Sequence, residues 1–342
     1  MEKNISNKYL LVAGLLLFIL LFGCLQQQQQ GKVLTIYTYD SMASEYGLGP
    51  VVVPEFEKQC GCKVDMIAAG DAGQVLNRLV LEKDNPKADV VIGIDNSMKT
   101  QAINAGVLDK FSPSTILLVP ENLRFDKEGY LTPYDYGFIA FLYDENKIDS
   151  APENFNDLLS PEFEKKIIIQ NPRTSSPGLA LLLWTIAVYG DPGYKEYWQK
   201  LEPNILTVTS SWDESAGLFS AGEAPIYLSY ATSPPYYAAI EGKPNFKAAK
   251  FSEGHYIQVE GIAIVKGTKN RELAEKFIEF SLTGKFQNEI PLHQYMFPVA
   301  KDAALPESFK YALTPDKQLE LDDKLVAKKQ GEWISEWEKI FS

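Results

Sequence analysis

Short apolar segments alternate with segments of helical spacing along most of this 342-residue chain. Residues 88–94, ADVVIGI, form a near-continuous apolar run, which is typical of a strand buried on both faces of a sheet. Residues 272–282 have the apolar spacing of an amphipathic helix. We predict strands at residues 33–39, 63–69, 88–94, 166–170, 205–209 and 225–230, and a pair of strands within 256–265. We predict helices at residues 53–59, 74–82, 97–105, 178–189, 214–220, 234–241 and 272–282, and a charged helical tail over 317–341.

The order of these elements is that of an α/β protein. Without its first 30 residues the chain has about 312, which exceeds the size at which a single hydrophobic core stops growing, so we expect two lobes. We place one lobe in residues 31–132 together with 256–342, and the other in residues 133–255. Two such lobes joined by extended crossings predict a hinge with a ligand cleft between them.

Residues 1–30 have the pattern of a secretion signal or lipid anchor followed by a polar tether. Lysines precede an apolar run at residues 9–23, which is short for a membrane span because an apolar helix needs roughly 20 residues to cross a bilayer. The run ends at LFGC, which resembles the box where lipoprotein signals are cut and Cys24 is acylated. Phe22 is bulky for that position, so an uncleaved N-terminal anchor stays an alternative. Either route predicts a chain outside the cytoplasm, held at the outer face of the cell membrane by a glutamine-rich tether at 26–30.

The chain is acidic, with a formal net charge of −12 at pH 7. Such a surface cannot attract a phosphate backbone, and the sequence has no basic stripe, so we expect no nucleic-acid partner. An acidic surface suits a cationic ligand, although solubility alone also accounts for it. We expect a monomer.

Cys60 and Cys62 flank Gly61 and are the two cysteines left once residues 1–30 are set aside. In an oxidising compartment such a pair favours a disulfide, which the intervening glycine makes feasible. A metal site would need more ligands than two sulfurs, and His255 and His293 lie far away in the sequence. We therefore predict a local disulfide, with neither a metal nor a cofactor.

The sequence lacks the common catalytic motifs. G-x-S-x-G, H-E-x-x-H, G-x-G-x-x-G and the Walker A pattern are all absent, which argues against an enzyme but leaves an unfamiliar secreted hydrolase as an alternative. Aromatic residues instead stand at predicted strand ends and in loops, where their faces can bind planar or cationic ligands. For any single one of these residues, packing in the core is a better explanation than ligand contact. Trp212 is the exception, because it lies in the polar turn SSWDE before a predicted helix. These residues are Tyr37, Tyr39, Trp212, Tyr230, Tyr236, Tyr237 and Tyr295.

Two polar turns are further candidates for ligand contact. Asp71 lies in the turn GDAG between a strand and a helix, where a ligand contact and a simple helix cap are equally good explanations. Ser175 and Ser176 lie in the turn PRTSSPG, whose amides and hydroxyls can accept a phosphate or an uncharged polar group. For either serine alone, an N-cap is the better explanation.

Together these segments resemble the thiamine-binding periplasmic proteins of bacterial thiamine ABC importers. The similarity is collinear from about Leu34 to Trp337, with only small gaps. The similar stretches are LTIYTYDS (34–41), GPVVVPEFEKQCGCKV (49–64), LNRL (76–79), ADVVIGIDN (88–96), PYDYGFIAFLYD (133–144), NPRTSSPGLALLLW (171–184), SWDESAGLF (211–219), LSYATSPPYY (228–237), FSEGHYIQVE (251–260) and WISEW (333–337).

The resemblance implies a type II periplasmic-binding-protein fold whose two lobes close on thiamine or a thiamine phosphate. It also implies an ABC permease and its ATPase as partners. The family often has glycine in place of Ala72 and tryptophan in place of Tyr295, which leaves affinity and phosphate preference open. The implied ligand contacts are Asp71, Ala72, Ser175, Ser176, Trp212, Tyr230, Ala231, Thr232 and Ser233, with Tyr39, Tyr236 and Tyr295 as further aromatic contacts.

A different solute on the same fold, such as iron(III) or a polyamine, stays an alternative. Iron needs oxygen or nitrogen ligands clustered in the cleft, and the tyrosine pair Tyr236 and Tyr237 is compatible with that chemistry.

Overall fold

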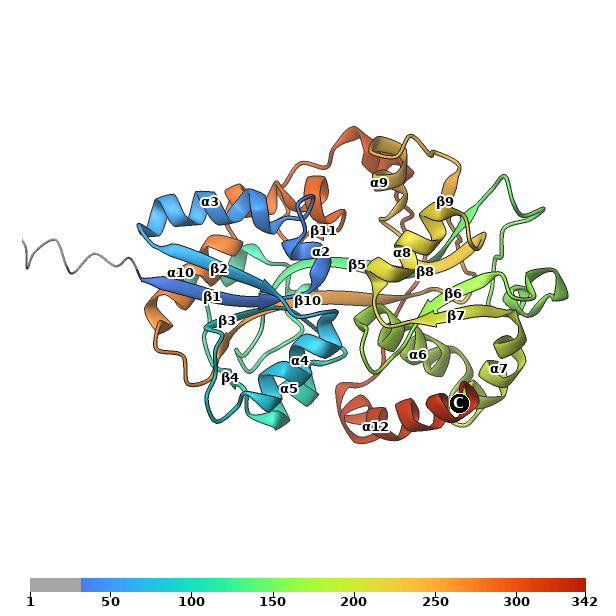
Figure 1. The fold of residues 1–342 in the computed structure, drawn as a ribbon, viewed down its shortest axis with the longest axis horizontal. Coiled ribbons are helices and arrows are strands. Elements are labelled where there is room, and N and C mark those ends of the chain that lie inside the picture. The colour runs from blue at the N-terminus through green and yellow to red at the C-terminus, as the bar shows by residue number, and fades with distance from the viewer. Residues whose placement is uncertain (1–31) are drawn as a thin grey trace, which may run out of the picture.

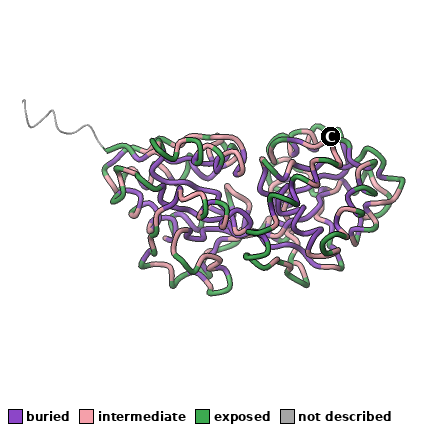
Figure 2. Tube along the Cα trace, turned by 90° about the horizontal axis from the view of Figure 1, so that it is seen from below, coloured by how far each residue is buried: buried purple, intermediate pink, exposed green. Residues whose placement is uncertain are grey.

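The structure, a computed structural model, describes residues 32–342 and folds them into two α/β lobes side by side (Figure 1). In a view from below, the two halves meet at a narrow waist (Figure 2). The predicted signal, the Cys24 anchor and the glutamine tether lie outside the described residues. In residues 32–342 no helix is both long enough and apolar enough to cross a membrane.

Each lobe is built on part of one continuous, mixed sheet. The strands of the first lobe are β1 (Val33–Thr38), β2 (Lys63–Ala68), β3 (Val90–Asp95), β4 (Leu108–Asp109) and β11 (Phe297–Pro298). Those of the second lobe are β6 (Ile167–Gln170), β7 (Ile205–Thr209), β8 (Ile226–Tyr230) and β9 (Phe246–Ala248). Two long strands, β5 (Thr132–Asp144) and β10 (His255–Val265), lie between them, and the short β12 (Gln318–Leu319) pairs with β10. The order across the sheet is β2-β1-β3-β10-β5-β8-β6-β7.

Strand β5 joins the lobes. Its first half pairs with β10, and from Ile139 onward it pairs with β8 and β9 of the second lobe. The predicted pair of strands within residues 256–265 is wrong, because β10 is one continuous strand, buried along its whole length. Its register against both neighbours shifts around Gly261, so the glycine produces a β-bulge and not a turn.

Helices cover both faces of the sheet (Figure 1). They are α2 (Asp40–Ala43), α3 (Gly49–Cys60), α4 (Ala72–Leu81), α5 (Lys99–Ala105), α6 (Ser176–Tyr189), α7 (Gly193–Leu201), α8 (Trp212–Ala221), α9 (Pro234–Ala239), α10 (Arg271–Ser281), α11 (Gly284–Gln287) and α12 (Asp323–Ile340). Shorter 3₁₀ turns lie at Ser114–Leu118, Glu121–Leu123, Asp157–Leu159, Pro161–Phe163, Glu202–Asn204 and Glu307–Tyr311, and a π-turn at Ile290–Gln294.

Two helices illustrate how burial follows the sequence. The first eleven residues of α6 are all buried, as expected of a helix that is apolar on every side. Helix α7 was not predicted, although its buried residues Tyr194, Tyr197, Trp198 and Leu201 have regular helical spacing.

The C-terminal helix α12 packs against α6 and α7 of the second lobe and also against α5 of the first lobe. Trp337 of α12 lies edge-on to Trp198 of α7, with ring centroids 5.7 Å apart. Helix α12 therefore contacts both lobes. The helix begins only at Asp323, because residues 318–319 of the predicted helical tail form β12. The lobe boundaries stay a prediction.

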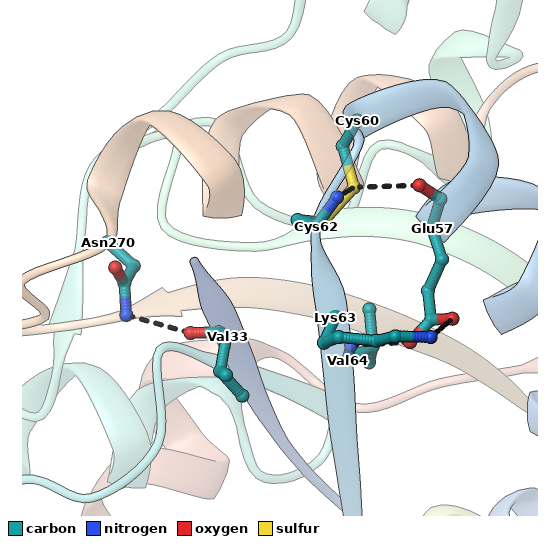
Figure 3. The surroundings of a disulfide bond; sticks show 7 residues. All are labelled: Val33, Glu57, Cys60, Cys62, Lys63, Val64 and Asn270. Atoms are coloured by element: carbon teal, nitrogen blue, oxygen red, sulfur yellow. Dashed lines mark hydrogen bonds and ion pairs between the residues drawn. A yellow bond between two sulfur atoms is a disulfide. The ribbon is translucent and has the colours of Figure 1, made fainter. Parts of the chain in front are cut away.

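The predicted disulfide between Cys60 and Cys62 is present at the end of α3 (Figure 3). Gly61 caps the helix in the left-handed conformation, with φ of 63°, and the two Cα atoms are 5.2 Å apart. Glu57 of the same helix accepts hydrogen bonds from the Val64 amide and the Lys63 ammonium group. These contacts fasten the start of β2 to α3.

Candidate functional site

A cavity of about 430 Å³ lies between the lobes, a size within the range of roughly 300–1,000 Å³ that small-molecule sites have. Its walls come from residues just after β1, β2, β7 and β8 and from the first turns of helices. This is the arrangement expected when strands end at a ligand cleft. The predicted contacts that line the cavity are Tyr39, Asp71, Ser176, Trp212, Tyr230, Ser233, Tyr236 and Tyr295.

Four predicted contacts, Ala72, Ser175, Ala231 and Thr232, are buried behind this lining. The Ala72 amide donates to the carboxylate of Asp71, and the Ala231 amide donates to the carbonyl of Phe138. Ala72 and Ala231 therefore support the turns that carry lining residues. Direct contact between any of these four residues and a ligand stays a prediction.

Asp71 is the N-cap of α4, and it also contacts the opposite lobe. One carboxylate oxygen accepts from the Ala72 amide at 2.6 Å, and Gln74 completes a capping box. The other oxygen accepts from the Trp212 amide of α8 at 3.0 Å. Burial raises the pKa of Asp71, while these hydrogen bonds act in the opposite direction. The capping explanation is thus present in the structure, together with a bridge between the lobes that the sequence did not reveal.

Trp212 is the first residue of α8, and its side chain forms part of the cavity wall. Its indole Nε1 donates to the Ser229 hydroxyl at 2.9 Å, and Ser229 in turn contacts the Ser233 hydroxyl at 2.8 Å. The ring is tilted by 50° to that of Tyr230, with centroids 6.4 Å apart. The indole is therefore held by its polar edge, which leaves its faces to contact the cavity and Tyr230.

Tyr236 and Tyr295 form a second aromatic wall, with ring centroids 5.2 Å apart in an edge-to-face arrangement. Tyr295 follows the π-turn Ile290–Gln294 and has a φ of 53°, a conformation that is uncommon for residues other than glycine. Such irregular backbone is frequent at functional sites.

Glu260 is a cavity-lining residue that the sequence analysis missed. It lies on the buried strand β10, and its carboxylate accepts from the Tyr39 hydroxyl at 2.8 Å, from the Tyr134 hydroxyl at 2.5 Å and from the Gln258 amide at 3.2 Å. Burial raises the pKa of Glu260, and the hydrogen bonds from the two tyrosines oppose that shift. The one signal in the sequence was an acidic residue inside a mostly apolar strand, where unpaired charge is costly.

The cavity is strongly acidic. Four carboxyl groups line it, those of Asp71, Asp213, Glu241 and Glu260, whereas no lysine or arginine of residues 32–342 does. Burial, together with the charges of Asp71 and Asp40, raises the pKa of Asp213 to about 6. Tyr237, an aromatic candidate from the sequence, also lines the cavity. Other lining residues that the sequence did not indicate are Ser41, Ser44, Tyr46, Gly47, Pro177, Ala216, Gly217, Ser220, His293, Gln294 and Met296.

Asp95, at the end of β3, is fully buried next to this acidic region, and we expect it to make stability depend on pH. One oxygen accepts from the Met98 amide, and the other has no partner. Burial, reinforced by the charge of Glu260, raises the pKa of Asp95 to about 8. The folded protein therefore holds a proton that the unfolded chain releases near pH 4. The stability that this bound proton gives the folded protein is fully present below about pH 4 and is lost as the pH rises through about 8.

Asp95→Asn removes this titration while keeping the oxygen that accepts from Met98. The melting temperature of the variant relative to the wild type should therefore rise between pH 5 and pH 8. Thermal unfolding followed by circular dichroism at both pH values measures the difference. A difference that is the same at both pH values would show that Asp95 does not titrate in this range.

A cavity between two α/β lobes, lined by aromatic and carboxylate groups, indicates a solute-binding protein. The family described as "Bacterial extracellular solute-binding protein" matches residues 85–318. The chain is 43% identical over 311 residues to the thiamine-binding periplasmic protein of Escherichia coli K12, covering 91% of this chain and 94% of that protein. This chain belongs to the thiamine-binding periplasmic proteins, within the bacterial extracellular solute-binding family.

Solved structures agree with this assignment. A periplasmic thiamin-binding protein superposes with a TM-score of 0.87 at 42% identity, over 92% of this chain and 98% of that one. A ferric-binding protein from Campylobacter jejuni has a TM-score of 0.77 at 25% identity, over 90% of this chain and 99% of that one. The type II binding-protein fold expected from the resemblance is confirmed.

Proposed function

We propose that this protein captures thiamine outside the cytoplasm and delivers it to an ABC permease driven by an ATPase. The observation that carries the proposal is the cavity, whose walls combine aromatic rings with carboxylates and contain no lysine or arginine from the described part of the chain. Thiamine joins a positively charged thiazolium ring to a flat aminopyrimidine. Aromatic faces and carboxylates are the groups that such a ligand requires.

The lining groups suggest an orientation for the ligand. The rings stack against Trp212 and the pair Tyr236 and Tyr295, and the carboxylates balance the positive charge. The hydroxyethyl group, or a phosphate on it, faces the start of α6, where the Ser176 hydroxyl and the N-terminal end of the helix lie at the cavity.

The remaining parts of the proposal concern location and partners. We propose that Cys24 carries a lipid that anchors the protein at the outer face of the membrane, with an uncleaved N-terminal anchor as the alternative. We further propose that the protein is a monomer, needs no cofactor and returns its ligand chemically unchanged.

Iron(III) is the second candidate ligand, because the tyrosine pair Tyr236 and Tyr237 is compatible with iron binding. The Tyr237 hydroxyl, however, contacts the Tyr227 hydroxyl at 2.7 Å, and its side chain is buried. Within residues 32–342, no group of three or more histidine, cysteine, aspartate or glutamate residues is arranged to hold a metal ion. A polyamine matches the carboxylates, and its ammonium groups can lie over aromatic faces, but it has no flat ring to stack on them. Thiamine accounts for both features.

Ligand release tests the function directly. Protein purified after incubation with thiamine and extensive dialysis should, on denaturation, release an equimolar amount of unaltered thiamine, identified by mass spectrometry. Parallel incubations with iron(III) citrate and with spermidine measure the alternatives. Release of iron or spermidine without thiamine would replace the proposed ligand, and a chemically altered thiamine would indicate an enzyme.

A further inference from the structure

Three acidic residues lie side by side on adjacent strands where the two lobes meet. Glu260 of β10 is in register with Asp95 of β3 on one side and with Asp135 of β5 on the other. All three side chains are buried, and that of Glu260 reaches the cavity wall. Like charges opposite one another destabilise a sheet, so this row of carboxyl groups is unfavourable for the fold itself.

No basic group compensates the row. Among the ion pairs that residues 32–342 form, none includes Asp95, Asp135, Glu260 or the nearby Asp71. The titratable groups that influence Glu260 and its two neighbours are themselves acidic: Asp71, Tyr39 and Tyr134. Buried carboxylates without a partner are strongly unfavourable in a protein that binds nothing there. The missing positive charge is therefore expected to come from outside the chain.

The three carboxyl groups differ in their hydrogen bonds. Glu260 accepts from Tyr39, Tyr134 and Gln258, whereas both oxygens of Asp135 and one oxygen of Asp95 have no partner. Hydrogen bonds to an ionised carboxylate favour that form. Burial and the charge of Glu260 raise the pKa of Asp135 well above its usual range and that of Asp95 to about 8. Of the three carboxyl groups, Glu260 is therefore the one whose hydrogen bonds best support a negative charge.

Glu260 is also held in a fixed position. It lies on a central strand, and the Tyr39 hydroxyl that donates to it is itself contacted by Gln294 at 2.6 Å and by Tyr134 at 2.7 Å. Tyr39 and Gln294 line the same cavity. The Glu260 carboxylate is therefore preorganised, so ligand binding costs little side-chain entropy at this position.

We propose that Glu260 is the counter-ion that selects a positively charged heteroaromatic ring in the cavity, so that this protein recognises its ligand by charge as well as by shape. This inference rests on the proposed binding of thiamine. It assigns the specificity for the cationic ring to a residue of β10, separate from the turn that carries Asp71.

A neutral ligand of the same shape tests the inference on the wild-type protein. In the thiophene isostere of thiamine, a neutral thiophene replaces the thiazolium ring and the aminopyrimidine and hydroxyethyl groups are kept. Isothermal titration calorimetry should give a dissociation constant for thiamine at least about tenfold lower than for the isostere, a difference typical of a buried charge-assisted contact. Equal affinities would overturn the inference and leave the proposed function intact, whereas failure of thiamine to bind at all would overturn the function.

Glu260→Gln then locates the effect. The glutamine keeps an oxygen for the tyrosine hydroxyls and loses the charge, so thiamine affinity should fall at least about tenfold while affinity for the isostere changes little. Asp144→Asn is the matched control, because Asp144 is a buried carboxylate at the far end of β5 and does not line the cavity. If Glu260→Gln lowers the affinities for thiamine and for the isostere equally, Glu260 has a role in packing and is not the counter-ion. If Asp144→Asn lowers thiamine affinity as much as Glu260→Gln does, the effect is not specific to Glu260.

Discussion

Replacing Trp212 with alanine should weaken thiamine binding at least tenfold while the melting temperature stays close to that of the wild type. A tryptophan face over an electron-poor ring combines dispersion with cation attraction, worth up to about 2 kcal/mol when water is excluded. A loss of roughly 1.4 kcal/mol already corresponds to a factor of ten in affinity. Trp212 is only partly buried and belongs to none of the hydrophobic core clusters of residues 32–342, so its loss leaves the core intact.

Fluorescence gives a second measurement on the same variant. The other four of the five tryptophans, Trp184, Trp198, Trp333 and Trp337, are fully buried, and none of them lines the cavity. Saturating thiamine should therefore quench emission in the wild type, and Trp212→Ala should remove most of that quench. Trp212→Phe should keep part of the affinity, because a smaller ring still stacks. A normal dissociation constant for folded Trp212→Ala would rule out stacking on this residue.

Replacing Asp71 with asparagine should lower thiamine affinity without destabilising the protein. Asparagine caps a helix about as well as aspartate, so the bond from the Ala72 amide can be kept. Its amide nitrogen cannot accept from the Trp212 amide, however, so the bridge to the second lobe is lost together with the negative charge. We expect a loss of about 1–3 kcal/mol, the usual range for a charge-assisted hydrogen bond.

Affinity and melting temperature should be measured on one preparation, by calorimetry and thermal unfolding. Asp40→Asn is the control, because Asp40 is an exposed carboxylate that accepts from the Gly70 amide beside the same turn and, within residues 32–342, forms no hydrogen bond with the second lobe. Its charge also acts on Asp213 at the cavity wall, but solvent screens an exposed carboxylate, so the loss of thiamine affinity should be much smaller than for Asp71→Asn. An Asp71→Asn variant with unchanged affinity would limit Asp71 to its capping role.

The sequence predicted the elements whose signals are local. The apolar run of β3 and the turns that carry Asp71, Ser176 and Trp212 could be located because strand ends and helix starts have characteristic residues. Strand β10 was divided wrongly because a glycine in a strand indicates a bulge or a turn equally well. The register of neighbouring strands decides which, and register is not a local property.

The row of acidic residues could not be predicted from the sequence, because it too depends on strand register. Asp95, Asp135 and Glu260 are separated by 40 and 125 positions, and only the pairing of β3, β10 and β5 brings them together. Asp71 makes one contact of each kind. Its cap could be predicted from neighbouring residues, whereas its bond to the Trp212 amide depends on how two lobes meet.

The attachment of α12 affects how easily the lobes separate. The helix packs on the second lobe, but Asp323 in its first turn pairs with Lys99 of α5 in the first lobe. A rotation that carries α12 away from α5 must stretch or break this pair. Because Asp323 is more than half exposed, the attraction is screened by dissolved ions, over a Debye length of about 8 Å at physiological ionic strength. We therefore expect the rates at which ligand enters and leaves to depend on the salt concentration around the protein.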